Sequence, residues 1–146
     1  MNQLQTWLVE DRIIFTSLIG PLTVDMFPGM DERIIAMLEA SSGTNIHIIA
    51  DISMMTTMPN VIQMAKLKYP SHPKVGIFLT QGRNPIEKFI GGTVGQMFKS
   101  NYKFINDLEQ GIRFLAEYDT TLPSANEMMR RINEIRNQFI KDASES

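Results

Sequence analysis

The chain has 146 residues, of which 43% are hydrophobic, and 14 Lys and Arg against 16 Asp and Glu give it a net charge of -2. A chain this apolar and this close to neutral is not intrinsically disordered, and its length is typical of a single domain. Because it has no Cys, disulfides, thiol nucleophiles and Cys-ligated metals are excluded. A near-neutral chain also lacks the basic surface typical of nucleic-acid binding, so we expect no nucleic-acid partner.

The sequence gives no indication of a membrane-spanning helix or of a signal peptide. A bilayer-spanning helix needs about 20 consecutive apolar residues, and no run in the sequence reaches that length. The first six residues, Met1–Thr6, have neither the basic start nor the apolar stretch of a signal peptide. We therefore expect a cytoplasmic protein without a membrane span.

The first third of the chain predicts a hairpin, a helix and a buried strand. Residues 5–9 and 12–18 are β-branched and aromatic runs around Glu10–Asp11, a pattern typical of two strands joined by a tight turn. Apolar residues then follow at helical spacing, namely Phe27, Met30, Ile34 and Leu38. The continuous apolar run 46–52 predicts a strand covered on both faces.

Helices and strands alternate in the middle of the chain. The pattern predicts a short helix over 60–68, a strand over 75–79, a helix from Asn84 to about Ser100, a strand over 102–105 and a helix over 106–118. Such alternation favours an α/β fold. We expect a mixed, mostly parallel sheet of four to five strands, with an N-terminal β-hairpin and packed helices.

An additional helix is predicted at the end of the chain, so we divide the chain into an α/β domain over 1–122 and an amphipathic helix over 123–146. Its apolar stripe is formed by Met128, Ile132, Ile135 and Phe139. A stripe of large apolar side chains must be covered, either by its own domain or by a second copy. We expect a homodimer in which these four residues supply much of the interface.

The order of the elements resembles the STAS superfamily of anti-sigma-factor antagonists, and more closely the bacterial SpoIIAA-like proteins of the STAS/SEC14 type. The segments that carry the resemblance are Ile49–Ser53 at the end of a central strand, Val75–Leu79, Tyr102–Phe104 and the helix that contains Phe114–Leu115. The resemblance covers roughly residues 4 to 118. It implies the same fold and a regulatory function through a protein partner.

The resemblance also implies a phosphorylation site. In the anti-sigma antagonists a partner kinase phosphorylates a Ser or Thr at the start of the helix after the Asp-Leu-Ser element. Asp51-Ile52-Ser53 keeps that element, but the Asp-Ser pair expected downstream is missing. Asn60 falls at the acceptor position by spacing, and Thr57 precedes it by three residues. Thr57 is the remaining candidate acceptor.

Ligands of open α/β sheets bind beyond the carboxyl ends of the parallel strands. Several polar and Met side chains follow two of the predicted strands, and they form the candidate ligand site: Ser53, Met54, Thr57, Met58, Asn60, Thr80, Arg83 and Asn84. Arg83 is suited to a carboxylate or phosphate, and flexible Met side chains are suited to an adaptable apolar pocket. Ordinary turn and capping roles are the alternative for the polar residues.

No catalytic or metal-binding constellation is predicted. A Ser/His/Asp relay needs His within hydrogen-bond reach of a nucleophile such as Ser53. His47 lies within a predicted buried strand, and His72 lies in a turn at the opposite edge of the sheet. The Gly91–Gly95 stretch lies inside a predicted helix, unlike a phosphate-binding loop. We expect no catalytic residues, no metal and no cofactor.

Two functions remain open. The first is a non-catalytic regulatory or protein-interaction module of the STAS type. The alternative is a small binding protein that holds a lipid-like or other amphipathic ligand in a Met-lined pocket, with Arg83 at its entrance.

Overall fold

The structure is a computed structural model that describes residues 2–23, 25–57, 61–82 and 101–145. The helix expected from Asn84 to Ser100 lies outside the described residues. The same holds for four of the candidate site residues, namely Met58, Asn60, Arg83 and Asn84.

One five-stranded sheet runs through the molecule, with its strands in the order of the chain: β1 (Gln3–Val9), β2 (Ile13–Gly20), β3 (Ile46–Met55), β4 (Val75–Gln81) and β5 (Asn101–Ile105). The first pair is antiparallel and the other three pairs are parallel. The expected fold class is therefore confirmed, including the N-terminal hairpin. Asp11, in the hairpin turn, has a φ of 62°, a conformation that Asp tolerates better than most residues.

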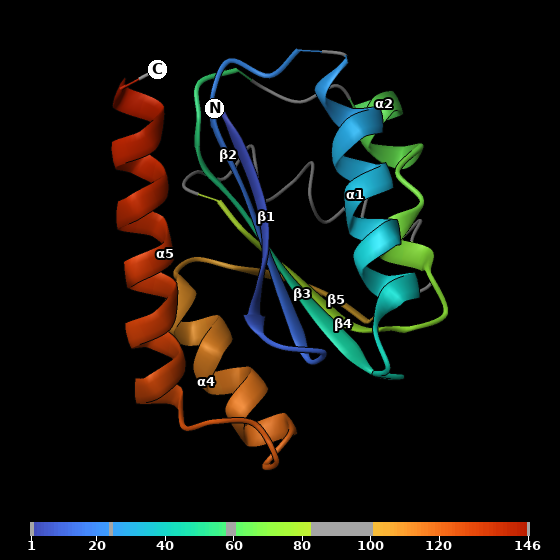
Figure 1. Ribbon diagram of the computed structural model, residues 1–146, viewed down its shortest axis with the longest axis vertical. Helices are drawn as coiled ribbons and strands as arrows, with labels where there is room; N and C mark the ends of the chain where they lie inside the picture. The colour runs from blue at the N-terminus through green and yellow to red at the C-terminus, as the bar shows by residue number, and fades with distance from the viewer. Residues whose placement is uncertain (1, 24, 58–60, 83–100, 146) are drawn as a thin grey trace.

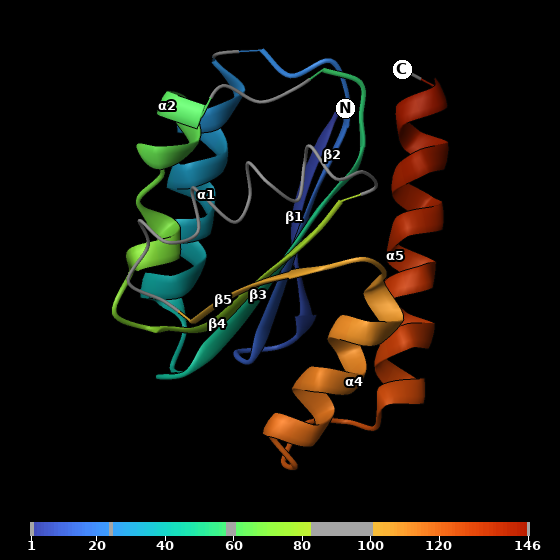
Figure 2. The same ribbon diagram turned by 180° about the vertical axis from the view of Figure 1, so that it is seen from behind.

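Helices cover both faces of the sheet (Figures 1 and 2). One face carries α1 (Met26–Ala40), α2 (Val61–Ala65) and a 3-10 turn, η1 (Tyr69–Ser71). The other face carries α4 (Leu108–Tyr118) and α5 (Ala125–Glu145). None of the helices in the described part of the chain is long and apolar enough to span a membrane.

The helix expected over 60–68 is shorter than predicted. It ends at Ala65, and the chain then enters η1, which has Pro70 at its start. The buried carboxylate of Asp31 in α1 accepts hydrogen bonds from the backbone N–H groups of Lys68 (3.0 Å) and Tyr69 (2.9 Å). These bonds satisfy donors that a continued helix would have bonded to its own carbonyls, which explains the early end.

Each face of the sheet has its own hydrophobic core. On the α1 face, Ile48, Ile52 and Phe78 pack against Phe27 and Ile34 of α1. On the other face, residues of β2, β3, β4 and β5 pack against α4 and α5, and they include Phe15, Ile49, Leu79 and Ile105. Adjacent residues of a strand therefore serve different cores, as the two-residue period of a strand requires.

The apolar stripe of α5 lies against its own domain. Met128 and Ile132 are fully buried, Phe139 is 4% exposed, and Ile135 is half-buried against the same core. This is the first of the two alternatives for covering the stripe. Three of the four residues on which we expected a homodimer interface are therefore already buried within the chain.

Candidate functional site

The parallel strands end together at one edge of the sheet, as predicted. Asp51 of β3 lies opposite Ser17 of β2 on one side and Gln81 of β4 on the other, and Gln81 in turn lies opposite Ile105 of β5. Ser17, Asp51 and Gln81 thus form a polar row across three strands near their carboxyl ends. Such a row is the place where an α/β sheet usually carries its functional side chains.

Asp51 is the centre of this row and is fully buried. Its Oδ1 accepts a hydrogen bond from the Ser53 hydroxyl (2.6 Å) and another from the Ser53 backbone N–H (3.0 Å). Its Oδ2 accepts from the Nε of Arg136, at 3.0 Å. A buried carboxylate needs such donors, because the charge has lost its water. Ser53 and Arg136 therefore hold Asp51 in place.

Arg136 comes from α5, 85 residues further along the chain. Its side chain is 27% exposed, so the guanidinium lies between the buried carboxylate and the solvent. This ion pair fastens the C-terminal helix to the carboxyl edge of the sheet. The sequence analysis did not identify Arg136, since no local pattern reveals a contact over this distance.

Two buried polar atoms near Asp51 have no hydrogen-bond partner among the described residues, namely Ser17 Oγ and Gln81 Oε1. The Gln81 amide N–H group donates weakly to the backbone carbonyl of Asn106, at 3.4 Å. Unpaired buried polar atoms cost free energy. Below, the name polar row also includes Ser53 and Arg136, whose side chains donate to Asp51.

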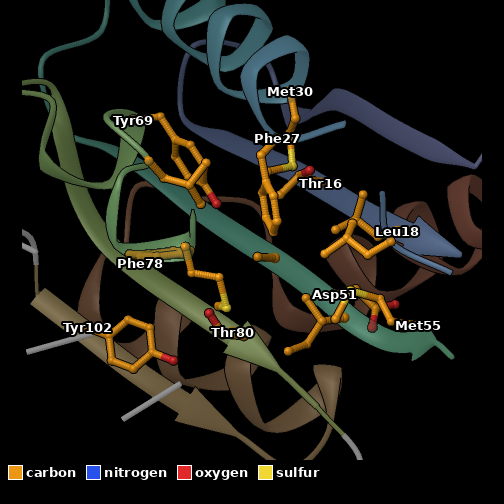
Figure 3. Close-up of a pocket in the computed structure, with 15 residues that line it drawn as sticks. Thr16, Leu18, Phe27, Met30, Asp51, Met55, Tyr69, Phe78, Thr80 and Tyr102 are labelled. Carbon is orange, nitrogen blue, oxygen red and sulfur yellow. The ribbon is translucent and has the colours of Figure 1, made fainter. Parts of the chain in front are cut away.

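On the opposite face of the sheet lies a small apolar cavity (Figure 3). Its volume is about 50 Å³. Side chains of α1, the strands and the β3–β4 connection line it: Thr16, Leu18, Leu22, Phe27, Met30, Ala50, Asp51, Ile52, Met55, Met64, Leu67, Tyr69, Phe78, Thr80 and Tyr102. Phe27 and Met30 enter from α1, and Phe78, Thr80 and Tyr102 from β4 and β5 (Figure 3).

The cavity has few polar groups. Its polar groups include the hydroxyls of Thr80 and Tyr102. Burial raises the pKa of Tyr102, although the Thr80 side chain acts in the opposite direction. Burial likewise raises the pKa of Tyr69, with a smaller contribution from the charge of Asp31. Both phenols are therefore neutral near pH 7, and the cavity carries no phenolate charge.

The structure places the described candidate site residues on different sides of the sheet. Ser53 belongs to the polar row on the α5 face, whereas Thr80 lines the cavity on the α1 face. Met54 is half-buried at the end of β3, and its neighbour Met55 is the one that lines the cavity. The alternation of side chains along a strand explains why residues predicted to form one site are separated.

Thr57, the candidate phosphoacceptor, lies in the exposed segment after β3. Its Oγ1 accepts a hydrogen bond of 2.9 Å from the backbone N–H of Leu22, which precedes α1. The hydroxyl thus connects the β3 end to the β2–α1 loop. It is accessible on the surface of the α1 side of the molecule.

His47 lies at the other end of β3 and is fully buried. Its Nδ1 accepts a hydrogen bond from the backbone N–H of Ile77 (3.1 Å), which leaves the proton of the neutral ring on Nε2. Nε2 lies 3.8 Å from Asp119 Oδ2 and has no hydrogen-bond partner among the residues that the structure describes. Burial lowers the pKa of His47, although Asp119 acts in the opposite direction. Six residues of extended strand, about 20 Å, separate it from Ser53.

A wider surface groove of about 400 Å³ runs between α1 and α2. Its apolar floor consists of residues that are buried or half-buried, namely Phe27, Ile35 and Leu67, and its charged rim of exposed ones, namely Glu32, Lys66 and Lys68. Pro28, Asp31 and Gln63 complete the lining. Ile62 of α2 directly precedes Gln63 and is 66% exposed, more than the other exposed large apolar residues of the described chain. We call the groove together with Ile62 the α1–α2 surface.

No protein-family model matches the chain, and no curated protein matches its sequence. Among solved structures, it is similar to an uncharacterised protein of the DUF3478 family with a SpoIIAA-like fold from Shewanella loihica PV-4. The TM-score is 0.58 and the identity 14%, over 77% of this chain and 91% of that chain. An anti-sigma factor antagonist from Mycobacterium paratuberculosis matches with a TM-score of 0.48 and 16% identity, over 80% of this chain and 93% of that one. The similarity to the Shewanella protein shows that the chain has a SpoIIAA-like fold.

Proposed function

We propose that the chain is a non-catalytic regulatory module of the STAS type, which acts in the bacterial cytoplasm by binding a protein partner through the α1–α2 surface. The observation that carries the proposal is the 66% exposure of Ile62 beside an open groove. A single exposed apolar side chain is common. Next to a groove with an apolar floor and a charged rim, it has the make-up of a protein interface.

The composition of the groove supports a protein partner in particular. Phe27, Ile35 and Leu67 supply apolar area at its floor. Lys66 and Glu32 supply charges of both signs at its rim, which favours a partner surface of mixed charge over a uniformly acidic or basic one. Thr57 is exposed and connected to Leu22, near the start of α1, and remains the proposed phosphoacceptor. A phosphate there would add charge beside the α1–α2 surface.

Three contacts support a non-catalytic role. The Ser53 hydroxyl donates to the buried Asp51, whose second oxygen is taken by Arg136. His47 lies about 20 Å from Ser53 along β3, and its Nδ1 accepts a hydrogen bond from the backbone N–H of Ile77. A general base must lie within hydrogen-bond reach of the proton that it removes. The polar row is therefore built to hold the chain together.

A second candidate function, binding of a small apolar or amphipathic ligand, is favoured by the cavity beneath α1. Three Met side chains line it, Met30, Met55 and Met64, and Met repacks readily around different shapes. An apolar cavity that binds benzene has a volume of about 150 Å³, three times that of this cavity. A lipid-like ligand would therefore enter only after these side chains move.

The experiment that separates the two functions is affinity capture with a matched pair of variants. Ile62→Asp places a charge on the α1–α2 surface, and Ile140→Asp places the same charge on α5, where Ile140 is 42% exposed. We expect a protein that is retained by the wild type and by Ile140→Asp and is lost with Ile62→Asp. Equal retention by all three would contradict the proposed surface. The second function would be favoured if native mass spectrometry of the purified chain detects a co-purified small molecule and the capture experiment retains no protein.

A further inference from the structure

β1 is one of the two edge strands of the sheet in the part of the chain that the structure describes, and β5 is the other. It lies between α1 and α5 in both views of the molecule (Figures 1 and 2). An edge strand offers a row of backbone N–H and C=O groups to any further strand that approaches it. The pairing of β1 with β2 determines which of its residues offer these groups.

The backbone of Gln3, Gln5 and Trp7 faces outward. The N–H of Ile19 donates to the carbonyl of Asn2, at 2.9 Å, so these two residues form a hydrogen-bonded pair of the antiparallel ladder. Hydrogen-bonded pairs alternate along such a ladder. Leu4 and Thr6 therefore bond to β2, opposite Ser17 and Phe15, and the residues between them direct their backbone groups away from the sheet.

β1 lacks the features that usually protect an edge. Proteins block exposed edges with charged residues, Pro, bulges or very short strands. β1 has seven residues, Gln-Leu-Gln-Thr-Trp-Leu-Val, with no charge, Pro or Gly. Its bulge lies beyond Trp7, after the outward-facing residues. Arg33 of α1 donates to the side-chain oxygens of Gln3 and Gln5, which holds these side chains over the α1 face and away from the edge.

We propose that this edge is the interface to a second copy of the chain, whose β1 pairs with it in antiparallel orientation about a two-fold axis at Gln5. In this register Gln5 lies opposite Gln5 of the second copy, and Gln3 lies opposite Trp7. Only residues with outward-facing backbone groups are then paired with one another, as an antiparallel ladder requires. This interface is separate from the α1–α2 surface and does not depend on the proposed function.

The side chains on the α5 face also fit this register. Opposite residues of an antiparallel pair point to the same face, so Leu4 of the second copy lies beside Thr6. A groove of about 350 Å³ is present there between β1 and α5, with Leu4, Thr6, Ile135 and Phe139 among its lining residues. Leu4 of each copy would therefore enter the groove of the other. No charge of either β1 is buried in the process, because β1 has none.

Oligomeric state is the first test, measured by sedimentation over a range of protein concentrations. Thr6→Lys introduces a charge where Leu4 of the second copy would lie. In the single chain this charge is compensated by Glu134 and Asp142, which line the same groove. Thr120→Lys is the matched control, because Thr120 is exposed in the turn after α4. We expect a dimer for the wild type and for Thr120→Lys, and a monomer with unchanged circular dichroism for Thr6→Lys. A monomeric wild type, or a dimeric Thr6→Lys, would overturn the proposal.

Cysteine cross-linking tests the register, and it is clean because the chain has no Cys. Opposite residues of a hydrogen-bonded pair have Cα atoms about 5.5 Å apart, within the range of about 4.4–6.8 Å for disulfides. We expect Gln5→Cys to form an intermolecular disulfide under mild oxidation. Gln3→Cys should not, because four residues of strand, about 13 Å, separate the two thiols. Equal cross-linking of both variants, or of neither, refutes this interface.

Discussion

The ion pair between Arg136 and Asp51 makes a large and specific contribution to stability on our account. The informative change is Arg136→Met, which removes the guanidinium and keeps an apolar stem that packs on the helix. Oδ2 of Asp51 accepts from Arg136 Nε at 3.0 Å, and the carboxylate is fully buried. Without Arg136, the described structure leaves that oxygen without a side-chain donor.

The expected loss of stability follows from how deeply each partner of the ion pair is buried. Removing one partner of a buried ion pair costs about 3–5 kcal/mol in unfolding free energy. The Arg136 side chain is 27% exposed, so water reaches part of the vacated volume, and we expect the lower end, about 3 kcal/mol. Arg131→Met on the same helix is the matched control, since Arg131 and Glu127 are 38% and 36% exposed. An exposed pair of this kind is worth about 0.2–1 kcal/mol.

Urea unfolding measures both variants, followed by circular dichroism and by the fluorescence of Trp7, the single Trp of the chain. Adding Asp51→Asn to Arg136→Met should restore part of the loss, because an amide has no charge that needs a cation. Equal losses for Arg136→Met and Arg131→Met would show that the ion pair with Asp51 makes no special contribution. A double variant whose loss is the sum of the two single losses would show the same.

Three further predictions concern stability. Burial lowers the pKa of His47 below that of the unfolded chain, so unfolding takes up a proton as the pH falls below about 6.5, and the free energy of unfolding should decrease there. Urea unfolding at pH 7 and pH 5 should show this decrease in the wild type and a smaller one in His47→Gln. The hydrogen bond of Thr121, more than the charge of Arg12, lowers the pKa of Asp119 to about 2. The contribution of Asp119 to stability should therefore persist until the pH falls below about 3.8 and disappear as the pH falls through about 2. Asp119→Asn should remove this acid-dependent change, and an acid transition identical to that of the wild type would contradict the prediction. A chain that ends at Leu122 loses three buried side chains of α5, each worth about 1.5–3 kcal/mol. Their combined loss approaches the whole stability of a domain, about 5–15 kcal/mol, so we expect this chain to be unfolded by circular dichroism. A folded chain would contradict the packing of α5.

The sequence was sufficient for the fold because its patterns are local. The β-branched and aromatic run at 12–18 and the continuous apolar run at 46–52 identify strands by composition and burial, and these strands are β2 and β3. The early end of α2 was missed, because it depends on the Asp31 carboxylate binding the backbone at Lys68 and Tyr69. That contact joins residues 37 and 38 positions apart and has no local signature.

The candidate site was predicted less well for the same reason. The carboxyl edge was predicted correctly, because β3, β4 and β5 run parallel. Ser53 and Thr80 were assigned to one site, whereas the pleat of the sheet directs them to opposite faces. Arg136 was missed because helical periodicity shows which residues are polar and not which distant carboxylate one of them contacts.

Binding of a protein by the α1–α2 surface is measured by the dissociation constant of the captured protein for three forms of the chain, namely the wild type, Ile62→Asp and Ile140→Asp. Burying an Ile side chain is worth about 1.5–3 kcal/mol, and each 1.4 kcal/mol corresponds to about a tenfold change in affinity. We therefore expect Ile62→Asp to weaken binding by at least about tenfold, while Ile140→Asp leaves the dissociation constant of the wild type unchanged. Equal dissociation constants for Ile62→Asp and the wild type would contradict binding through the α1–α2 surface.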